Sequence, residues 1–247
     1  MTLVAGAVLP HAPLLVPEVT EVERATEVVH AAREAVARVG ATVIMVSPHG
    51  ERSGVYAGAR GSLRKLGIPD VVGEAKPVPE IAGDLASAWD RPLITEEVDH
   101  GVAVPLRMAP PGTRAVGVCL EETTGPTAGN LAAVLNDARE LAGCIAALPD
   151  PAVVVASAHT SAALTPRAPL TELPAGQKLD DAILEALRTD VGRLTEIPDR
   201  AWAEGGSCGA GPLVMLGHLF RGRRATVHAY EYPVGVGYLV ATVEARD

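Results

Sequence analysis

Nearly continuous apolar runs constrain the fold of this chain more than any other feature. The segments 42–47 (TVIMVS) and 151–157 (PAVVVAS) are rich in valine and show no alternation of polar and apolar positions. Such runs are typical of strands that are buried on both faces, as in a parallel sheet covered by helices. A further strand-like run occupies residues 2–9 (TLVAGAVL). We therefore expect a sheet with two covered faces.

Segments with helical periodicity alternate with these strands. Over residues 20–39 apolar residues recur at helical spacing, Thr20 and Glu23 form a capping box, and Gly40 closes the segment. Further helices are predicted at 80–89, 127–147, 179–194 and 212–220, and further strands at 55–56, 71–72, 114–120, 225–231 and 235–243. This alternation, without a repeat or a long linker, predicts one α/β domain over 1–247. We expect this domain to have three layers, with a central, mostly parallel sheet flanked by helices. Residues 2–47 are predicted to form a right-handed strand–helix–strand unit.

Composition excludes several classes of function. The formal net charge of −9 argues against nucleic-acid binding, because phosphate neutralisation needs clustered cations. No apolar run approaches the roughly 18 residues of a membrane span, and no signal segment begins the chain, so we expect a cytoplasmic protein without membrane contact. Cys119, Cys144 and Cys208 are too few and too widely spaced for a disulfide framework or a zinc motif. The first two lie in apolar surroundings and are predicted to be core residues.

Two histidines follow predicted strands of this sheet, at the ends where functional side chains of such sheets are usually found. His11 in LPHAP and His49 in VSPHG each follow a proline at the end of an apolar run. Open α/β sheets present side chains to a crevice at the carboxyl ends of their strands, and neutral imidazole is a common ligand of iron, zinc and copper. On adjacent strand ends, this pair predicts half of a metal site. The alternative is a pair of turn histidines bound to the backbone.

Two more histidines extend this cluster to four. His100 lies in an Asp-His-Gly phrase, and His159 follows the run 151–157. A third metal ligand has to be a carboxylate or a thiolate. The residues alone leave four candidates for it: Cys208, Glu204, Glu231 and Asp99. The remaining histidines are interpreted as surface or core residues: His30, His218 and His228.

Four phrases carry a resemblance to a known family. In chain order they are VLPHAPLLVPE, VSPHG, DHGVAVPL and YPVGVGYLVA, and together they extend from residue 8 to about residue 241. They resemble the LigB-type class III extradiol ring-cleavage dioxygenase superfamily, and more narrowly its bacterial and archaeal branch that includes the MEMO proteins. The resemblance implies a single α/β domain with a central sheet flanked by helices, which agrees with the alternation above.

The resemblance also implies roles for individual residues. His11 and His49 match the two metal histidines of the family, whose third ligand is a glutamate in the ring-cleaving enzymes and a cysteine in the MEMO branch. The segment CGAGPL at 208–213 resembles the cysteine motif, so Cys208 is the first choice, with Glu204 or Glu231 as alternatives. A helix start and a metal would both favour its thiolate. His100 matches a pocket histidine that hydrogen-bonds substrate or dioxygen.

One departure from the family pattern affects the expected chemistry. Where the family reads Ser-Gly-Asp-Leu-Ser-His, this chain reads SAHTSA at 157–162. The catalytic acid/base histidine of the family therefore falls on Ala162, which cannot transfer a proton, and His159 takes the position of the aspartate. Loss of a positioned general base costs about 10²- to 10⁴-fold in rate. His100 and His159 are the remaining candidates for catalytic proton handling.

Three functions are compatible with these residues. The first is a non-haem Fe(II) dioxygenase that opens a small catechol-type aromatic ring. The second is a MEMO-like redox or regulatory protein with a His-His-Cys site, where a thiolate shifts the metal preference toward copper or zinc. The third is a catalytically degenerate scaffold that serves another chain. The sequence leaves the substrate, the metal and the formation of a homo-oligomer open.

Overall fold

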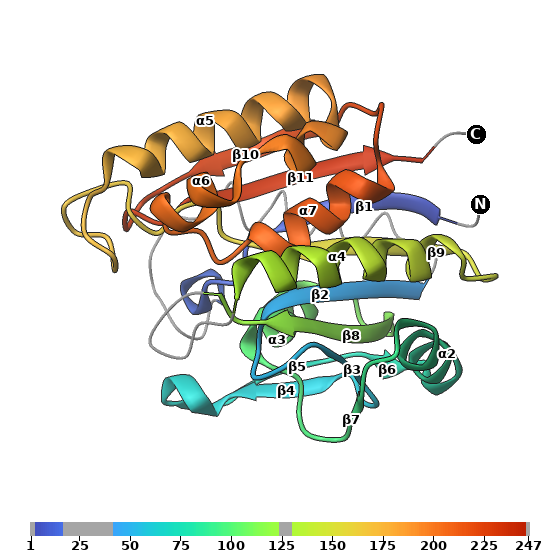
Figure 1. Cartoon of the computed structure of the whole chain (residues 1–247). Helices are drawn as coiled ribbons and strands as arrows, with labels where there is room; N and C mark the ends of the chain where they lie inside the picture. The colour runs from blue at the N-terminus through green and yellow to red at the C-terminus, as the bar shows by residue number, and fades with distance from the viewer. Residues whose placement is uncertain (1–2, 17–41, 124–129, 246–247) are drawn as a thin grey trace.

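The computed structural model describes residues 3–16, 42–123 and 130–245, and they form an α/β fold around one large sheet (Figure 1). In the described residues this sheet has nine strands, in the order β10-β11-β1-β9-β2-β8-β3-β7, with β6 beside β8. The strands are β1 (Leu3–Leu9), β2 (Thr42–Gly50), β3 (Gly54–Tyr56), β6 (Lys76–Pro77), β7 (Leu93–Ile94), β8 (Arg114–Glu121), β9 (Ala152–Ser157), β10 (Thr226–Glu231) and β11 (Tyr238–Glu244).

The middle of the sheet is parallel, as predicted. Strands β1, β9, β2 and β8 pair in parallel, whereas β11 pairs antiparallel with β1 and with β10, and β3 pairs antiparallel with β8. The expectation that the strands before His11 and His49 are neighbours is wrong, because β9 lies between them and pairs with both. The insertion places the carboxyl end of β9 between the two histidines.

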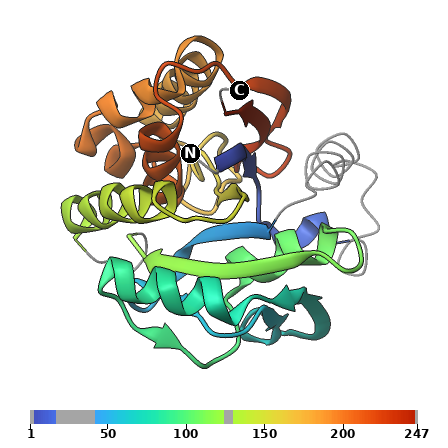
Figure 2. The same cartoon turned by 90° about the vertical axis from the view of Figure 1, so that its right-hand side faces the viewer.

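Both faces of the sheet are covered, because successive residues of each strand enter different cores. In β2, Ile44 and Val46 belong to one hydrophobic cluster, while Val43 and Met45 belong to the other. This is why the run 42–47 has no polar alternation. Figures 1 and 2 show the helices arranged around the sheet.

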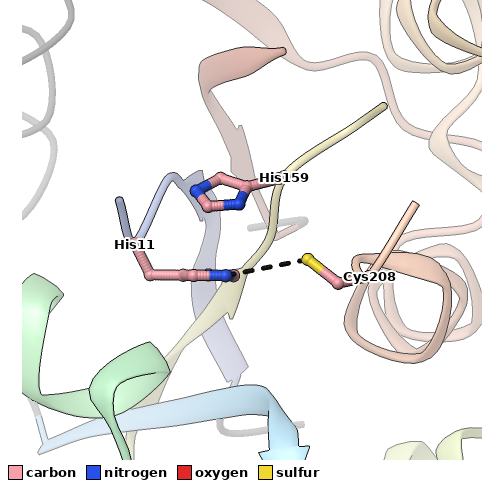
Figure 3. Close-up of side chains that lie close together, drawn as sticks. All are labelled: His11, His159 and Cys208. Atoms are coloured by element: carbon pink, nitrogen blue, oxygen red, sulfur yellow. Dashed lines mark hydrogen bonds between the residues drawn. The ribbon is translucent and has the colours of Figure 1, made fainter. Parts of the chain in front are cut away.

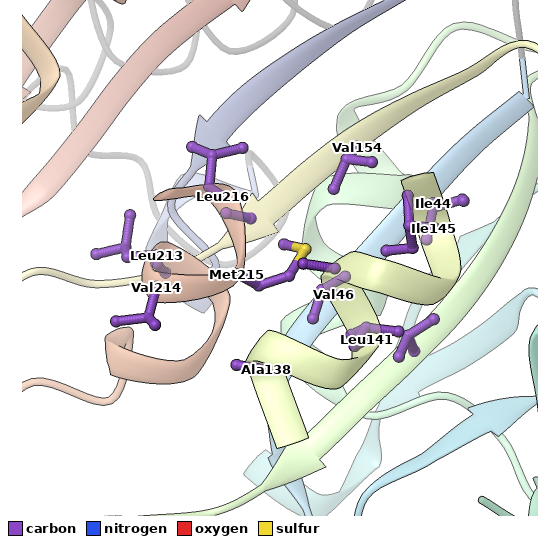
Figure 4. Packing of buried hydrophobic residues seen from close by; sticks show 14 of the residues in the cluster. Ile44, Val46, Ala138, Leu141, Ile145, Val154, Leu213, Val214, Met215 and Leu216 are labelled. Carbon is purple, nitrogen blue, oxygen red and sulfur yellow. The ribbon is translucent and has the colours of Figure 1, made fainter. Parts of the chain in front are cut away.

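The first core lies under six helical segments: α2 (Pro79–Trp89), α4 (Leu131–Ala146), α5 (Pro174–Thr189), α6 (Asp199–Glu204), α7 (Ala210–Leu219) and the 3-10 helix η4 (Val191–Glu196). Figure 4 shows side chains of β2 and β9 packing with those of α4 and α7, among them Ile44, Val154, Leu141 and Met215. The second core lies under α3 (His100–Met108), the 3-10 helix η1 (Pro13–Leu15) and a small second sheet of β4 (Arg60–Leu63) and β5 (Ile68–Glu74), which are joined by η3 (Arg64–Leu66).

Local signals explain where the helices differ from the prediction. The helix expected at 179–194 begins at Pro174 and ends at Thr189, because Asp190 leaves helical geometry and its side chain accepts a hydrogen bond from Gly192 at the start of η4. The helix expected from 127 is described from Leu131, where Asn130 caps it through the amides of Ala132 and Ala133. The helix predicted at 20–39 lies outside the described residues. Of the described helices, none is both long and apolar enough to cross a membrane.

Candidate metal centre

Four of the seven histidines meet at the carboxyl ends of the parallel strands. His11 follows β1, His49 lies at the end of β2, His159 follows β9, and His100 is the first residue of α3. The ring centroids are 3.9 Å apart for His11 and His159, 4.2 Å for His49 and His100, and 4.8 Å for His11 and His49. The fold thus concentrates imidazole groups where the strand ends predicted a crevice.

The donor atoms form two overlapping groups among the described residues. His11, His159 and Cys208 make one group, and His11, His49 and His100 make the other; within each, the ligand atoms lie within 4.8 Å of one another. The Nε2 atom of His11 lies 2.9 Å from Nε2 of His49 and 3.7 Å from Sγ of Cys208. Figure 3 shows His11, His159 and Cys208 side by side. His11 is therefore the common member of the cluster.

These separations fit a transition-metal ion. A tetrahedral ion with bonds of about 2.0–2.1 Å to nitrogen and about 2.3 Å to sulfur places two nitrogens ~3.4 Å apart and a nitrogen and a sulfur ~3.6 Å apart. The observed nitrogen–sulfur separation of 3.7 Å fits that arrangement, whereas the nitrogen–nitrogen separation of 2.9 Å is a hydrogen-bond distance, so the rings of His11 and His49 would move apart by about 0.5 Å around an ion. Soft thiolate and borderline imidazole donors together suit copper, zinc or iron rather than magnesium or calcium.

No carboxylate belongs to either donor group of the described residues, although Oε1 of Glu122 lies 3.4 Å from Nδ1 of His49. Within the described part of the chain, both donor groups consist only of histidine and cysteine. Glu204 is exposed and lines a groove of about 1010 Å³ between α5, η4 and α6. Glu231 lies at the end of β10, the edge strand of the sheet. Of the third-ligand candidates, the structure brings only Cys208 to the histidines.

Ser157 holds the ring of His11 in one orientation. The Ser157 hydroxyl donates to the carbonyl oxygen of Gly101 at 2.5 Å, so its oxygen accepts from Nδ1 of His11 at 3.0 Å. The proton of the neutral imidazole then resides on Nδ1, and the Nε2 lone pair points toward His49 and Cys208. Burial, followed by the neighbouring His159, His49 and His100, holds the pKa of His11 well below its usual value. An oriented, neutral imidazole of this kind is ready to ligate a metal.

The charges of Cys208 and His49 depend on each other. Burial raises the pKa of the Cys208 thiol, but hydrogen bonds with His159 and His49 outweigh burial and lower it to about 5. Burial likewise lowers the pKa of His49, but Cys208 and Glu122 outweigh it and raise the pKa to about 10. Near neutral pH the site therefore contains a thiolate, the form of cysteine that binds metals.

Asp99, a candidate ligand in the sequence, has a structural role. Its Oδ1 accepts from Ser47 Oγ at 2.6 Å and from the Gly101 amide at 2.7 Å, and its Oδ2 accepts from Tyr56 at 2.9 Å. The carboxylate caps α3 and so fixes His100 at the first helical position. Burial, followed by the charges of His49 and His159, lowers the pKa of His100 to about 3, so its ring is neutral.

Several sequence predictions concern residues outside this cluster. Ala162 is half-buried, and its amide donates to the Gly206 carbonyl. Cys119 is buried as predicted, whereas Cys144 is half-buried against the first core. His218 lies half-buried in α7, His228 is exposed in β10, and His30 lies outside the described residues. Sequence reasoning missed Ser157 as the partner of His11, although it is the first residue of the SAHTSA phrase.

Fold and site together define an α/β protein with a histidine- and cysteine-rich centre at the carboxyl ends of parallel strands. Residues 5–241 match the family described as the catalytic LigB subunit of aromatic ring-opening dioxygenase. The match covers nearly the whole chain, which therefore belongs to this family. The resemblance of the four sequence phrases to the LigB family is confirmed.

Two further proteins are similar to this chain, one in sequence and one in structure. A Clostridium acetobutylicum protein named "Protein CA_C1420" is 26% identical over 275 aligned residues, which cover 99% of this chain. The chain spans only 58% of that relative's length. The crystal structure of uncharacterized protein JW3007 from Escherichia coli K12 matches with a TM-score of 0.64 and 16% identity, covering 97% of this chain and 99% of that one. At this identity the match supports the LigB-like fold alone.

Proposed function

We propose that this chain binds one iron(II) ion through His11, His49 and Cys208 and acts as a ring-opening dioxygenase on small catechol-type aromatics. The observation that carries the proposal is that Nε2 of His11 lies 2.9 Å from Nε2 of His49 and 3.7 Å from Sγ of Cys208, in a chain from the ring-opening dioxygenase family. Bound iron(II) would supply the site where an aromatic diol and dioxygen come together. The protein's own residues hold the ion and orient its ligands.

The residues around the ion have separate roles. Ser157 keeps the lone pair of His11 directed at the ion through its bond to Nδ1. His100 is neutral at physiological pH and is positioned by the Asp99 cap, so it can donate or accept a hydrogen bond at a substrate hydroxyl. Ala162 has no titratable group at the acid/base position of the family. We therefore expect turnover about 10²- to 10⁴-fold slower than with a positioned base.

Metal content and dioxygen consumption test this proposal. Wild type, His11→Ala, His49→Ala and Cys208→Ser are reconstituted anaerobically with iron(II), analysed for iron, and supplied with a panel of catechols in an oxygen electrode. We expect about one equivalent of iron in wild type, its loss in the variants, and catechol-dependent oxygen uptake by wild type alone. Iron-loaded wild type that neither cleaves the catechols nor changes their spectra on binding overturns the dioxygenase proposal.

A thiolate centre of the MEMO kind, with a redox or regulatory role, is a second candidate. The lowered pKa of Cys208 and its 3.7 Å approach to His11 favour it, because a thiolate shifts metal preference toward copper(I) or zinc. Copper that is retained by wild type and lost by Cys208→Ser supports this candidate, whereas equal copper in both contradicts it. Wild type that takes up neither metal identifies a degenerate scaffold.

A further inference from the structure

His159 has surroundings that differ from those of a residue that transfers protons. Its ring lies against the ring of His11 at a centroid distance of 3.9 Å and an angle of 34°. A ring nitrogen of His159 lies within 4.8 Å of the donor atoms of both His11 and Cys208 (Figure 3). His159 is thus the histidine grouped with the thiolate, whereas His100 is grouped only with His11 and His49.

One nitrogen of the His159 ring has no route for a proton, although the ring also contacts the Cys208 thiol. Its Nε2 atom is buried and has no hydrogen-bond partner in the described structure. A general base has to lie within hydrogen-bond reach of the proton that it takes, directly or through one water. A buried ring nitrogen without a partner is unfavourable, because it has lost its hydrogen bonds to water. Nε2 of His159 is therefore poorly placed to exchange a proton with a substrate.

The backbone holds His159 beside Cys208. The Ser207 hydroxyl donates to the His159 carbonyl at 3.1 Å and accepts from the Gly209 amide at 3.0 Å. A Cβ atom at Gly209 would lie 2.6 Å from that same carbonyl oxygen, so this close approach requires glycine. The two residues that flank Cys208 are therefore both packed on His159.

A second set of contacts fixes His159 relative to the sheet. The amide of Ala158 donates to the Leu9 carbonyl at 2.9 Å, which ties the end of β9 to the end of β1. On its other side, His159 forms an isolated antiparallel bridge with Tyr238 at the start of β11. His11, His159 and Cys208 therefore come from three segments that are joined by hydrogen bonds or close packing.

We propose that His159 is a metal ligand, and that His11, His49, His159 and Cys208 form a centre with four protein donors. The proposal rests on the metal site of the proposed function and adds a fourth donor to it. Three protein ligands leave a catalytic metal with an open position, whereas four close a tetrahedral site. Four protein donors would leave the ion without an open position for an aromatic diol, so the resting centre would be closed.

Cobalt(II) tests this assignment without any assay of activity. Wild type, His159→Gln, His159→Phe and His100→Gln are loaded anaerobically with cobalt(II), and affinity is measured by competition with a chelator. Loss of a group that hydrogen-bonds a metal ligand already costs about 10- to 100-fold in metal affinity, so loss of a ligand should cost about 100-fold or more. We expect this loss in both His159 variants and a change below about tenfold in His100→Gln.

Electronic spectra report the coordination number independently. We expect wild type to show the intense visible bands of four-coordinate cobalt(II), unchanged by added azide. In the His159 variants these bands should weaken as water enters, and azide should change them. His159→Phe keeps an aromatic ring beside Tyr238, and thermal unfolding of the metal-free variants establishes that they are folded.

Two results overturn the inference while leaving the metal site intact. One is an unchanged affinity and spectrum in folded His159→Gln and His159→Phe. The other is a loss that appears in His100→Gln instead, which would make His100 the fourth donor. Wild type that binds no cobalt(II) defeats both this inference and the proposed function.

Discussion

Asp180 gives the fold a stability that depends on pH. It lies on α5 and is fully buried, and its Oδ2 accepts from Thr160 Oγ1 at 2.5 Å and from the Tyr230 hydroxyl at 2.6 Å. Its Oδ1 has no hydrogen-bond partner in the described structure. Burial raises the pKa of Asp180 from 3.8 to about 6, although the two hydroxyls act in the opposite direction. The charged carboxylate is therefore disfavoured in the folded protein.

The free energy follows from this difference in pKa. A difference of one in pKa corresponds to about 1.4 kcal/mol, so the change from 3.8 to about 6 amounts to about 3 kcal/mol. Because the folded state binds the proton more tightly, this stabilisation is fully present below the unfolded pKa of 3.8. It is lost as the pH rises through about 6, where the folded protein also has to ionise.

Asp180→Asn removes this titration while keeping an oxygen that can accept both hydroxyl protons. We compare the free energy of unfolding of the variant with that of wild type at each pH. The variant should gain about 3 kcal/mol relative to wild type as the pH rises from below 3.8 to above about 6. Urea unfolding followed by circular dichroism at a series of pH values measures this difference, in which the other titrating groups cancel. A difference that stays constant across this pH range would refute the reasoning.

Three further substitutions test the site and the core. Ser157→Ala removes the partner of His11 Nδ1 and should lower zinc affinity about 10- to 100-fold in a chelator competition, with the secondary structure unchanged. Gly209→Ala places a Cβ 2.6 Å from the His159 carbonyl and should cost about 1–3 kcal/mol in urea unfolding and weaken metal binding; equal stability and affinity would contradict the close packing. Leu141→Ala in α4, fully buried, should cost about 2–5 kcal/mol, whereas Val4→Ala, 50% exposed, should cost far less in the same measurement.

The fold could be predicted because its strands and helices differ in local pattern. The runs 42–47, 114–120 and 151–157 are all strands of the parallel centre, and the helix predicted at 80–89 is observed at Pro79–Trp89. The end of the helix before Asp190 was not predicted, because the helical spacing of apolar residues continues beyond it. The Asp190 side chain instead caps the next turn, η4, and this cap ends the helix. The position of β9 between β1 and β2 was also missed, because pairing between residues that are 110 to 149 positions apart, as in Thr42 with Ala152 and Leu3 with Ala152, leaves no local pattern.

The candidate site was predictable in its residue types and only partly in its geometry. Prolines and strand ends marked His11 and His49, and the family phrases indicated Cys208, His100 and the departure at Ala162. The orientation of the His159 side chain could not be predicted from the alignment of this residue with an aspartate of the family. It depends on contacts with Ser207 and Tyr238, which lie 48 and 79 residues further along the chain.

The sequence by itself therefore determined that a covered parallel sheet forms, and that histidines stand at the ends of its strands. Apolar runs and the residues that end them are local properties, and they are sufficient for both conclusions. Only the tertiary structure decided that His159 lies against His11 and Cys208, and that no carboxylate joins them in the described residues. These outcomes follow from the insertion of β9 and the packing of Gly209 on His159, which bring segments distant in sequence into contact.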